Sequence, residues 1–462
     1  QVPISDKEVE QMSFYRPPDD TPELEYLKQC RTALGGHLPA RRTKGDSLEI
    51  PALTIFERLL QETGEREIST TQALVQAMTL LCKDKNIGQR VVPIVPDEAR
   101  TFGMEGMFRQ IGIYAHEGQK YEPVDRDQLM YYKENQSGQL LEEGITEDGA
   151  MSSWIAAATS YTNNGMQMIP FYIFYSMFGF QRIGDLVWAA GDMQARGFLI
   201  GATSGRTTLN GEGLQHEDGH SQIMAGNVPN CVSYDPTFSY ELMVILQDGM
   251  QRMFKKQENV FFYITTMNEN YSHPGLSKGQ EKDIVKGMYL FQKAKKGKTR
   301  VQLLGSGSIL REVIAAAVLL EKDFKVQADI WSCPSFNELK RDGDEVSRWN
   351  LLHPDKKARQ CHVTQCLEST EGPVVAATDY VKLFADQIRA YVPRSYAVLG
   401  TDGFGRSDSR EALRKHFEVD RYYITIAALN ELVGEGGISA KTVKAAIKKY
   451  GIDSEKNNPL LS

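Results

Sequence analysis

The apolar positions of this chain switch repeatedly between helical spacing and short continuous runs. From Ser69 onward they recur every three or four residues, which predicts a core-facing helix. The run at 91–95 is almost wholly apolar and is followed by Asp97 and Glu98. Such a run predicts a buried strand of a parallel sheet, with two acids at its carboxyl end.

The same alternation continues along the chain. Four further strands are predicted, at 169–175, 198–201, 231–234 and 260–266. Helical patterns separate them, and Asp235-Pro236 marks the expected start of the helix before the last strand. A second series of strands and helices begins at Val301. This order predicts an α/β fold in which mostly parallel, twisted sheets are flanked by helices.

Polar and lysine-rich segments divide the chain. Residues 1–60 are polar and proline-dotted over most of their length and are predicted to form a connecting arm. A first domain is expected over 61–278 and a second over 301–462, each with its own sheet. The segment 279–300 is rich in lysine and is expected to be a solvated linker between them.

Composition narrows the class of protein. The chain has 462 residues, of which 41% are hydrophobic and 24% charged, as in a soluble globular protein with more than one core. A net charge of −7 argues against a nucleic-acid partner. The longest apolar stretch, 168–180, is too short and too interrupted for a membrane span. Six scattered cysteines without a C-x-x-C pattern indicate a reducing compartment.

Residues 205–220 concentrate the reactive side chains. They contain two histidines, three carboxylates and four glycines. Histidine exchanges protons near neutral pH, carboxylates bias its charge, and glycines let the backbone turn tightly around a small molecule. Ligands of parallel sheets bind at the carboxyl ends of strands, where Asp97, Glu98 and Tyr175 would meet this loop. A reactive pocket is predicted there, with a plain polar surface loop as the alternative.

The pair His216 and His220 also fits the H-E-x-x-H pattern of zinc hydrolases. That chemistry requires a helix that places both imidazoles on one face. The glycines within the loop disfavour a helix, and no apolar stripe flanks it. A zinc hydrolase is therefore kept only as an alternative function.

Three longer motifs occur together, at 97–106, 171–182 and 211–220. With them, the chain resembles the homodimeric, bacterial-type decarboxylating component of pyruvate dehydrogenase, a thiamine diphosphate-dependent family of the transketolase superfamily. The resemblance extends over nearly the whole chain and matches the middle and C-terminal domains of that family. It implies decarboxylation of pyruvate, followed by reductive acetylation of the lipoyl domain of the acetyltransferase component of the complex.

The resemblance also assigns roles to residues. Glu147 would be the acid that hydrogen-bonds the pyrimidine ring nitrogen of the cofactor and promotes its imino tautomer. Tyr175 and Phe178 would pack against or hydrogen-bond the pyrimidine ring. Without the resemblance, Glu147 would be taken for an ordinary acid near a helix start, and the two aromatic residues for core residues.

On the substrate side, the resemblance implies that His216 orients pyruvate or the lipoyl group and handles protons. Glu212 would position the substrate or stabilise a charged intermediate. Asp97 and Glu98 would contribute to the cofactor pocket and order a dimer contact.

The family's diphosphate-binding domain, with its Gly-Asp-Gly motif, is not found in this sequence. Thiamine diphosphate and its Mg²⁺ would therefore be bound mainly by a domain absent from this chain, which itself contributes no metal ligand. Expected partners are a second copy or a chain carrying that domain, together with the lipoyl acetyltransferase component. A truncated half-subunit that serves only in dimerisation or assembly is a further alternative. The expected location is the cytoplasm of a bacterium, or otherwise the mitochondrial matrix or another reducing compartment.

Overall fold

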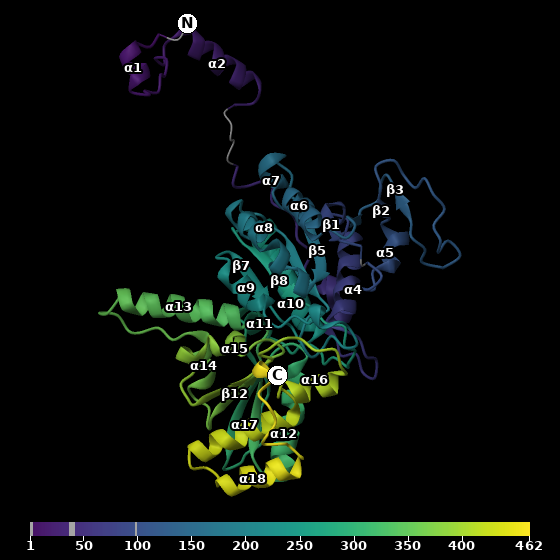
Figure 1. Ribbon diagram of the computed structural model, residues 1–462, viewed down its shortest axis with the longest axis vertical. Helices are drawn as coiled ribbons and strands as arrows, with labels where there is room; N and C mark the ends of the chain where they lie inside the picture. The colour runs from purple at the N-terminus through teal and green to yellow at the C-terminus, as the bar shows by residue number, and fades with distance from the viewer. Residues whose placement is uncertain (1–2, 37–41, 98) are drawn as a thin grey trace.

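The computed structural model describes residues 3–36, 42–97 and 99–462, with two sheets one above the other (Figure 1). The first sheet has six strands in the order β4-β1-β5-β6-β8-β7, and every neighbouring pair is parallel. The apolar runs predicted all of its strands except β4, a two-residue edge strand. The strands are β1 (Val91–Val95), β4 (Leu141–Glu142), β5 (Ile169–Tyr175), β6 (Phe198–Ala202), β7 (Cys231–Tyr234) and β8 (Phe261–Thr265).

Helices pack against this sheet. The helix predicted after Ser69 is α4, and the Ser69 hydroxyl caps it by accepting a hydrogen bond from the Gln72 backbone N–H at 3.1 Å. Strands β2 (Ile113–Tyr114) and β3 (Glu134–Asn135) form a small separate ribbon. The helical elements are η1 (Leu53–Phe56), α3 (Glu57–Leu60), α4 (Thr70–Cys82), η2 (Gly88–Arg90), α5 (Glu105–Gln110), α6 (Glu147–Ala158), α7 (Ser160–Asn163), η3 (Ser176–Phe178), α8 (Phe180–Asp192), η4 (Leu214–His216), α9 (Ser221–Asn227), α10 (Ser239–Met250) and the π-helical η5 (Gln251–Lys255).

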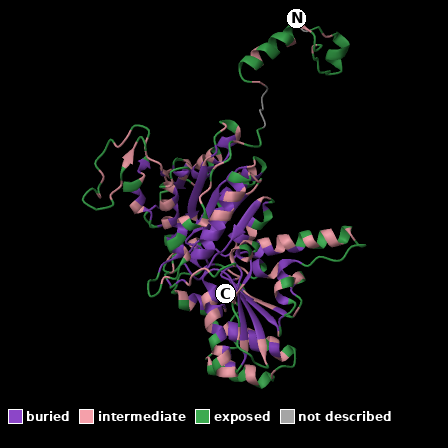
Figure 2. Cartoon of the chain, turned by 180° about the vertical axis from the view of Figure 1, so that it is seen from behind, coloured by how far each residue is buried: buried purple, intermediate pink, exposed green. Residues whose placement is uncertain are grey.

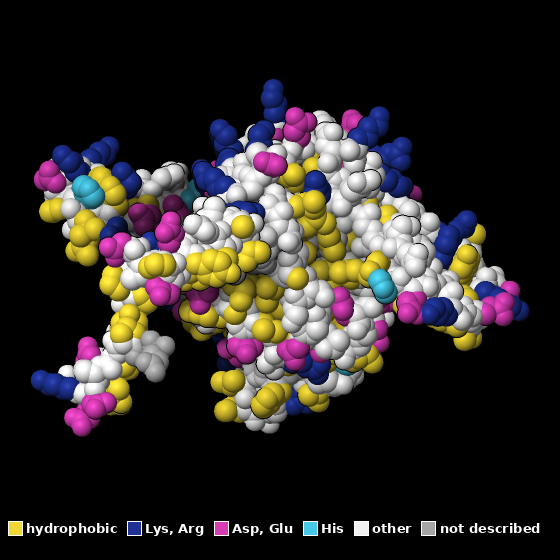
Figure 3. Space-filling model, turned by 90° about the horizontal axis from the view of Figure 1, so that it is seen from above, with side chains coloured by type: hydrophobic (Ala, Val, Ile, Leu, Met, Phe, Trp, Pro, Cys, Tyr) yellow, Lys and Arg dark blue, Asp and Glu magenta, His cyan; other side chains and the backbone are white. Residues whose placement is uncertain are grey.

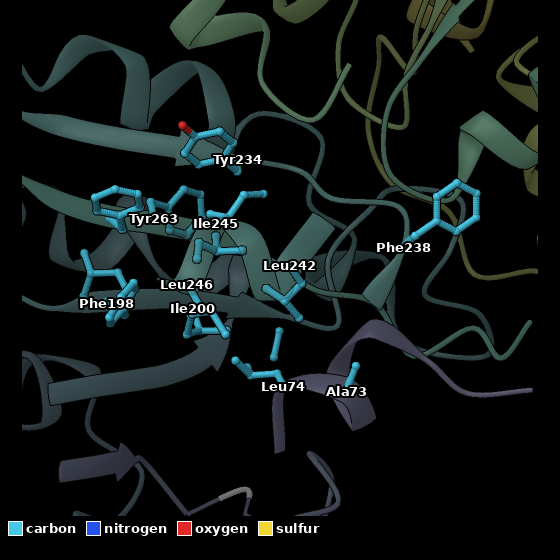
Figure 4. Packing of buried hydrophobic residues seen from close by; sticks show 14 of the residues in the cluster. Ala73, Leu74, Phe198, Ile200, Tyr234, Phe238, Leu242, Ile245, Leu246 and Tyr263 are labelled. Atoms are coloured by element: carbon cyan, nitrogen blue, oxygen red, sulfur yellow. The ribbon is translucent and has the colours of Figure 1, made fainter. Parts of the chain in front are cut away.

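The core of this first unit lies between the sheet and helices α4 and α10 (Figure 4). Leu74 of α4 and Leu242 of α10 are fully buried with Phe198 and Ile200 of β6. The Phe198 ring also stacks on Phe171 of the neighbouring strand, with 4.6 Å between ring centroids. This packing explains why the strands read as continuous apolar runs, because both faces of the sheet are covered.

The second sheet has five strands in the order β13-β12-β10-β11-β9, and only β9 runs antiparallel to its neighbour. Its strands are β9 (Tyr289–Gln292), β10 (Arg300–Gly305), β11 (Gln327–Ser332), β12 (Val374–Ala377) and β13 (Tyr396–Leu399). The helical elements of this unit are α11 (Glu281–Lys286), α12 (Ile309–Phe324), α13 (Phe336–Leu352), α14 (His362–Leu367), α15 (Leu383–Asp386), η6 (Arg389–Tyr391), α16 (Arg410–His416), α17 (Arg421–Gly434), α18 (Ala440–Lys449) and η7 (Pro459–Leu461). The mostly parallel α/β fold is thus confirmed in both units.

The structure differs from the sequence prediction at 279–300. This segment is not a bare linker, since it contains α11 and the strand β9. Ile284, Met288 and Tyr289 are buried between its lysines, and these few apolar side chains anchor it to the protein core. The segment has the composition of a solvated linker because α11 and β9 are short, and exposed lysines lie on α11 and just after β9.

The expected arm over 1–60 is also structured in its last part. Phe56 and Leu59 are buried against the first unit, and the Leu48 backbone N–H donates to the Phe254 carbonyl at 3.1 Å. Further upstream, α1 (Asp6–Glu10) and α2 (Pro22–Ala33) contain no buried residue. They stand away from both sheets, and their residues carry the colours of exposed and intermediate positions (Figure 2). No helix in the described part of the chain could cross a membrane.

Candidate active site

The predicted pocket lies where β5 and β6 end. Strand β5 ends at Tyr175 and continues into η3, which carries Phe178. The loop at 203–220, called the His216 loop below, follows β6. The imidazole of His216 lies against both aromatic rings, with centroid distances of 5.2 Å to Tyr175 and 5.0 Å to Phe178. Phe102 extends the cluster, its ring centroid 5.6 Å from that of Tyr175.

Glu147 joins the same cluster through an arginine. It is the first residue of α6, and the Thr146 hydroxyl caps that helix by accepting from Gly149 N at 3.1 Å. The Arg182 guanidinium donates to Glu147 Oε1 at 2.7 Å and stands over the Phe178 ring, 4.1 Å from its centroid. The Glu147 side chain is 14% exposed, so this ion pair is partly shielded from water.

The structure therefore brings together four residues that the sequence prediction assigned to one site: Glu147, Tyr175, Phe178 and His216. Glu212 lies half-buried on the His216 loop, ahead of the 3-10 turn at Leu214–His216, and does not take part in the ring cluster. Glu98 lies outside the described residues.

Asp97 is placed after β1, in the neighbourhood of Glu142. Burial raises the pKa of the Glu142 carboxyl to about 7, and the negative charge of Asp97 contributes to the increase. A hydrogen bond with Tyr132 acts in the opposite direction. Glu142 at the end of β4, which pairs with the end of β1, thus carries a carboxyl that gains or loses its proton near neutral pH.

The structure contradicts the helical geometry that a zinc hydrolase requires. The 3-10 turn η4 ends at His216, Glu217 has extended backbone, and α9 begins only at Ser221. Asp218 is fully buried and accepts hydrogen bonds from the backbone N–H groups of His220 and Ser221, each at 2.9 Å. Within the ranges described, no three His, Cys, Asp or Glu side chains are grouped to hold a metal. The acids of this motif serve to shape the loop.

Sequence reasoning missed two residues at this site. Arg182 is the last residue of the motif at 171–182, but nothing in the sequence indicates that its side chain binds Glu147. Asp379 comes from the second unit and accepts hydrogen bonds from Thr207 and Thr208 of the His216 loop, a partnership across 172 positions for Thr207. No periodicity or local motif could have indicated this contact.

Glu217, next to His216, is a buried acid with one hydrogen bond. Its Oε2 accepts from the Arg406 backbone N–H at 2.6 Å, while Oε1 is buried without a partner. Burial raises the pKa of this carboxyl from 4.5 to about 8, and the nearby charge of Asp379 adds to the increase. Glu217 is therefore protonated at neutral pH in the folded protein.

This raised pKa predicts a pH-dependent stability. The folded-state pKa of Glu217 lies above 4.5, the ordinary value that applies in the unfolded chain. The contribution of Glu217 to the free energy of unfolding is therefore complete below pH 4.5 and is lost as the pH rises through about 8. In Glu217→Gln, which retains an acceptor for Arg406, we expect a flatter pH profile. Between about pH 5 and about pH 9 the wild type should lose about 4 kcal/mol more unfolding free energy than the variant.

Urea denaturation of both proteins across this pH range measures the difference. Glu212→Gln is the matched control, because Glu212 lies on the same loop but is only half-buried. It should keep the wild-type pH dependence. Parallel profiles for wild type and Glu217→Gln would show that Glu217 does not titrate in this range.

Comparisons with known proteins agree with this architecture. Residues 48–274 match the family model described as the pyruvate dehydrogenase E1 component middle domain. Residues 287–420 match the transketolase-like TK C-terminal domain.

Curated relatives carry the same description. A protein of Cupriavidus necator named pyruvate dehydrogenase E1 component is 61% identical over 462 residues, covering 99% of this chain. The Escherichia coli K12 protein of the same name is 56% identical over 464 residues, covering 100% of this chain. In both cases the match covers 52% of the relative, so the chain spans about half the length of these proteins.

Solved structures show the fold. The transketolase of Campylobacter jejuni aligns with a TM-score of 0.58 at 15% identity, over 81% of this chain and 49% of that one. A structure described as "Split gene transketolase, inactive beta4 tetramer" aligns with a TM-score of 0.51 at 15% identity, over 79% of this chain and 98% of that one. The chain therefore belongs to the pyruvate dehydrogenase E1 component family, of which it contains the middle domain and the transketolase-like C-terminal domain.

Proposed function

We propose that this chain forms the ring-binding half of an enzyme that decarboxylates pyruvate on thiamine diphosphate and acetylates a lipoyl domain. The observation that carries the proposal is the cluster at the ends of β5 and β6, where a carboxylate, an imidazole and two aromatic rings meet. The family membership supports the same reaction, because relatives of twice this length bear the name pyruvate dehydrogenase E1 component.

The residues of the cluster fit the heterocyclic part of thiamine diphosphate. Arg182 occupies Oε1 of Glu147, so the second oxygen is left to exchange a proton with a ring nitrogen. Tyr175 and Phe178 supply flat apolar surfaces for an aromatic ring. His216 Nδ1 is buried without a hydrogen-bond partner, and a bound group would satisfy it.

The same residues do not provide a diphosphate site. The described part of the chain contains no cluster of carboxylates and imidazoles that could hold a metal. We therefore assign the diphosphate and Mg²⁺ to a domain outside this chain, either in a longer polypeptide or in a second one. The active site would then be shared between this chain and that domain.

In this mechanism thiamine diphosphate supplies the electron sink for decarboxylation. Glu147 holds and releases the proton at the pyrimidine nitrogen, with Arg182 fixing its orientation. The aromatic rings of Tyr175 and Phe178 exclude water from the reacting centre. His216 orients pyruvate or the lipoyl group and transfers protons there, and Glu212 positions the substrate from the same loop.

The proposal includes protein partners. The helices α1 and α2 contain no buried residue, and large apolar side chains such as Trp188 and Met193 are about half exposed. Seen from above, hydrophobic side chains gather in the middle of the upper face (Figure 3). Such surfaces favour contact with a second copy or the missing domain. The curated relatives are bacterial, so we assign the enzyme to the cytoplasm and find no support for a mitochondrial location.

One observation favours a second candidate, a chain that lacks turnover by itself. The transketolase chain described as inactive aligns with this chain over 98% of its own length, so it consists almost entirely of the two units seen here. We therefore propose to compare this chain alone, this chain with the missing half added, and the full-length protein. Each would receive thiamine diphosphate, Mg²⁺ and pyruvate, and release of carbon dioxide would be measured.

We expect carbon dioxide release from the completed enzyme and none from the isolated chain. Adding a lipoyl domain should then yield its acetylated form, detected by intact mass. A completed enzyme that leaves pyruvate unchanged would refute the proposed reaction.

A further inference from the structure

The His216 loop belongs to the first unit but is held largely by the second. Two stretches of the second unit reach it: the turn after β12 and the segment that leads into α16. Both stretches lie on the side of the second sheet that faces the first unit. The position of His216 thus depends on contacts between the two units.

The first anchor is Asp379, just beyond β12. Its carboxylate is fully buried and accepts from Thr207 N at 2.9 Å and from the hydroxyls of Thr207 at 2.7 Å and Thr208 at 2.6 Å. Thr208 also contacts Ser308, at the start of α12. Three donors of one loop therefore converge on a single acceptor group from the other unit.

The backbone of the loop is shaped to allow this approach. Gly205 has φ of +90°, a conformation that L side chains rarely adopt. A Cβ atom at this position would also collide with Asp379 Oδ2. Only glycine lets the loop bring its donors onto the carboxylate without strain.

The second anchor lies just after His216. Arg406 N donates to Glu217, and Gly405 lies so close to Leu214 and Glu217 that a side chain there would displace them. Val381 N donates to the Gly219 carbonyl at 2.8 Å. His216 therefore lies between two parts of the loop that are each held by hydrogen bonds to the second unit.

The buried guanidinium of Arg206 ties the two anchors together. It donates to the Thr401 carbonyl at 2.7 Å and also contacts the Gly403 carbonyl. Its charge faces Asp218 and Asp379, both fully buried. Burial raises the pKa of the Asp379 carboxyl, whereas the hydrogen bonds from Thr208 and Thr207 and the charge of Arg414 act in the opposite direction.

We propose that Asp379 is a positioning residue of the C-terminal domain, which fixes the His216 loop so that the imidazole stays against Tyr175 and Phe178. This inference rests on the proposed function, because it assigns to the second unit a part in the same reaction. Without the carboxylate, two threonine hydroxyls and one backbone N–H lose their buried acceptor. The loop then gains alternative conformations, most of which misplace His216.

Asp329 provides the matched control. It is also a buried carboxylate of the second unit and accepts from Ala294 N at 2.7 Å and from Lys293, Arg300 and Gln302. Asp329 lies near the beginning of β11, whereas Asp379 follows the end of β12. Because these strands are parallel, Asp329 lies at the end of the strands opposite to Asp379. Asp329→Ala removes at least as many hydrogen bonds as Asp379→Ala without touching the His216 loop.

The experiment uses the full-length enzyme with thiamine diphosphate, Mg²⁺, pyruvate and lipoyl domain. We expect Asp379→Ala to lower kcat by about tenfold to about a hundredfold, with the affinity for thiamine diphosphate changed less than about threefold. Asp329→Ala should lower thermal stability to a similar extent but keep kcat within about threefold of wild type. Asp379→Asn, which keeps an acceptor for the Thr207 donors, should recover most of the lost activity.

A double substitution tests whether Asp379 acts through His216. If it does, Asp379→Ala should cause little further loss of kcat when His216 is already alanine. Multiplicative losses in the double variant, or an equal loss of kcat in Asp329→Ala, would overturn the proposal.

Hydrogen exchange separates this proposal from the proposed function. Peptides covering 205–220 should exchange faster in Asp379→Ala than in wild type, with Asp329→Ala unchanged there. This readout holds whatever reaction the enzyme catalyses. A wild type without decarboxylase activity would refute only the reaction, whereas unchanged exchange in Asp379→Ala would refute the positioning role. Should Asp379→Ala fail to fold, Thr207→Val, which removes one hydroxyl donor to Asp379, takes its place and should show faster exchange over 205–220 than wild type, with Asp379→Asn as the variant that retains the acceptor.

Discussion

Substitution of Glu147 by glutamine is expected to lower pyruvate decarboxylation by about 10²- to 10⁴-fold in the completed enzyme. Glutamine keeps the shape of the side chain but cannot exchange a proton with the pyrimidine nitrogen. Arg182, which now donates to Glu147 Oε1, can still donate to the amide oxygen, so the local structure should persist. The loss would therefore reflect proton transfer and not misfolding.

Deuterium exchange at C2 of the bound cofactor measures this step directly, alongside the steady-state rate. Asp148→Asn is the control, because Asp148 follows Glu147 in the first turn of α6 but is exposed. It alters the charge at the same helix end and should keep exchange and turnover within about threefold of wild type. If Glu147→Gln still exchanged at the wild-type rate, the assignment of Glu147 would be wrong.

The strands could be predicted because their environment is simple. A strand covered on both faces needs apolar residues at every position, and β5, β6 and β8 show this in the sequence. Helix boundaries depend on tertiary partners and were less predictable. The helix expected from Asp235-Pro236 begins at Ser239 instead.

The reason for this displaced helix start lies in the contact between the two units. Asp235 accepts from the hydroxyls of Thr265 and Ser306, each at 2.8 Å, and so does not cap the helix. The backbone N–H groups of Thr237 and Phe238 are satisfied by Glu241, which reaches back from within α10. A sequence pattern shows a good helix cap but not a distant partner that competes for it.

Some residues of the site could likewise be predicted from the sequence, and others could not. The histidines and glycines of 205–220 indicated reactive chemistry through composition alone. Glu147 carried no such signal, because an acid in the first turn of a helix is common, and only the resemblance singled it out. The partners that hold the loop, Asp379 and Arg406, come from the second unit and could be identified only in the folded chain.

The histidine pair of the loop allows a second decisive experiment. We expect His216→Asn to lower kcat for acetylation of the lipoyl domain by about 10²- to 10³-fold, whereas His220→Asn stays within about threefold of wild type. The reason is their surroundings. The His216 ring packs between Tyr175 and Phe178 with a buried, unpartnered Nδ1, whereas His220 Nδ1 lies 3.7 Å from the loop-shaping Asp218.

Steady-state kinetics with pyruvate, with and without lipoyl domain, distinguish the two variants. Asparagine keeps a polar group of similar size at each position, so both variants should fold, and circular dichroism verifies this. The zinc-hydrolase alternative predicts equal losses for both histidines, since each would be a metal ligand. Equal losses would therefore refute our assignment. A loss confined to His216→Asn would favour it, because this imidazole lies against Phe178, whose ring also contacts the Arg182 that binds Glu147.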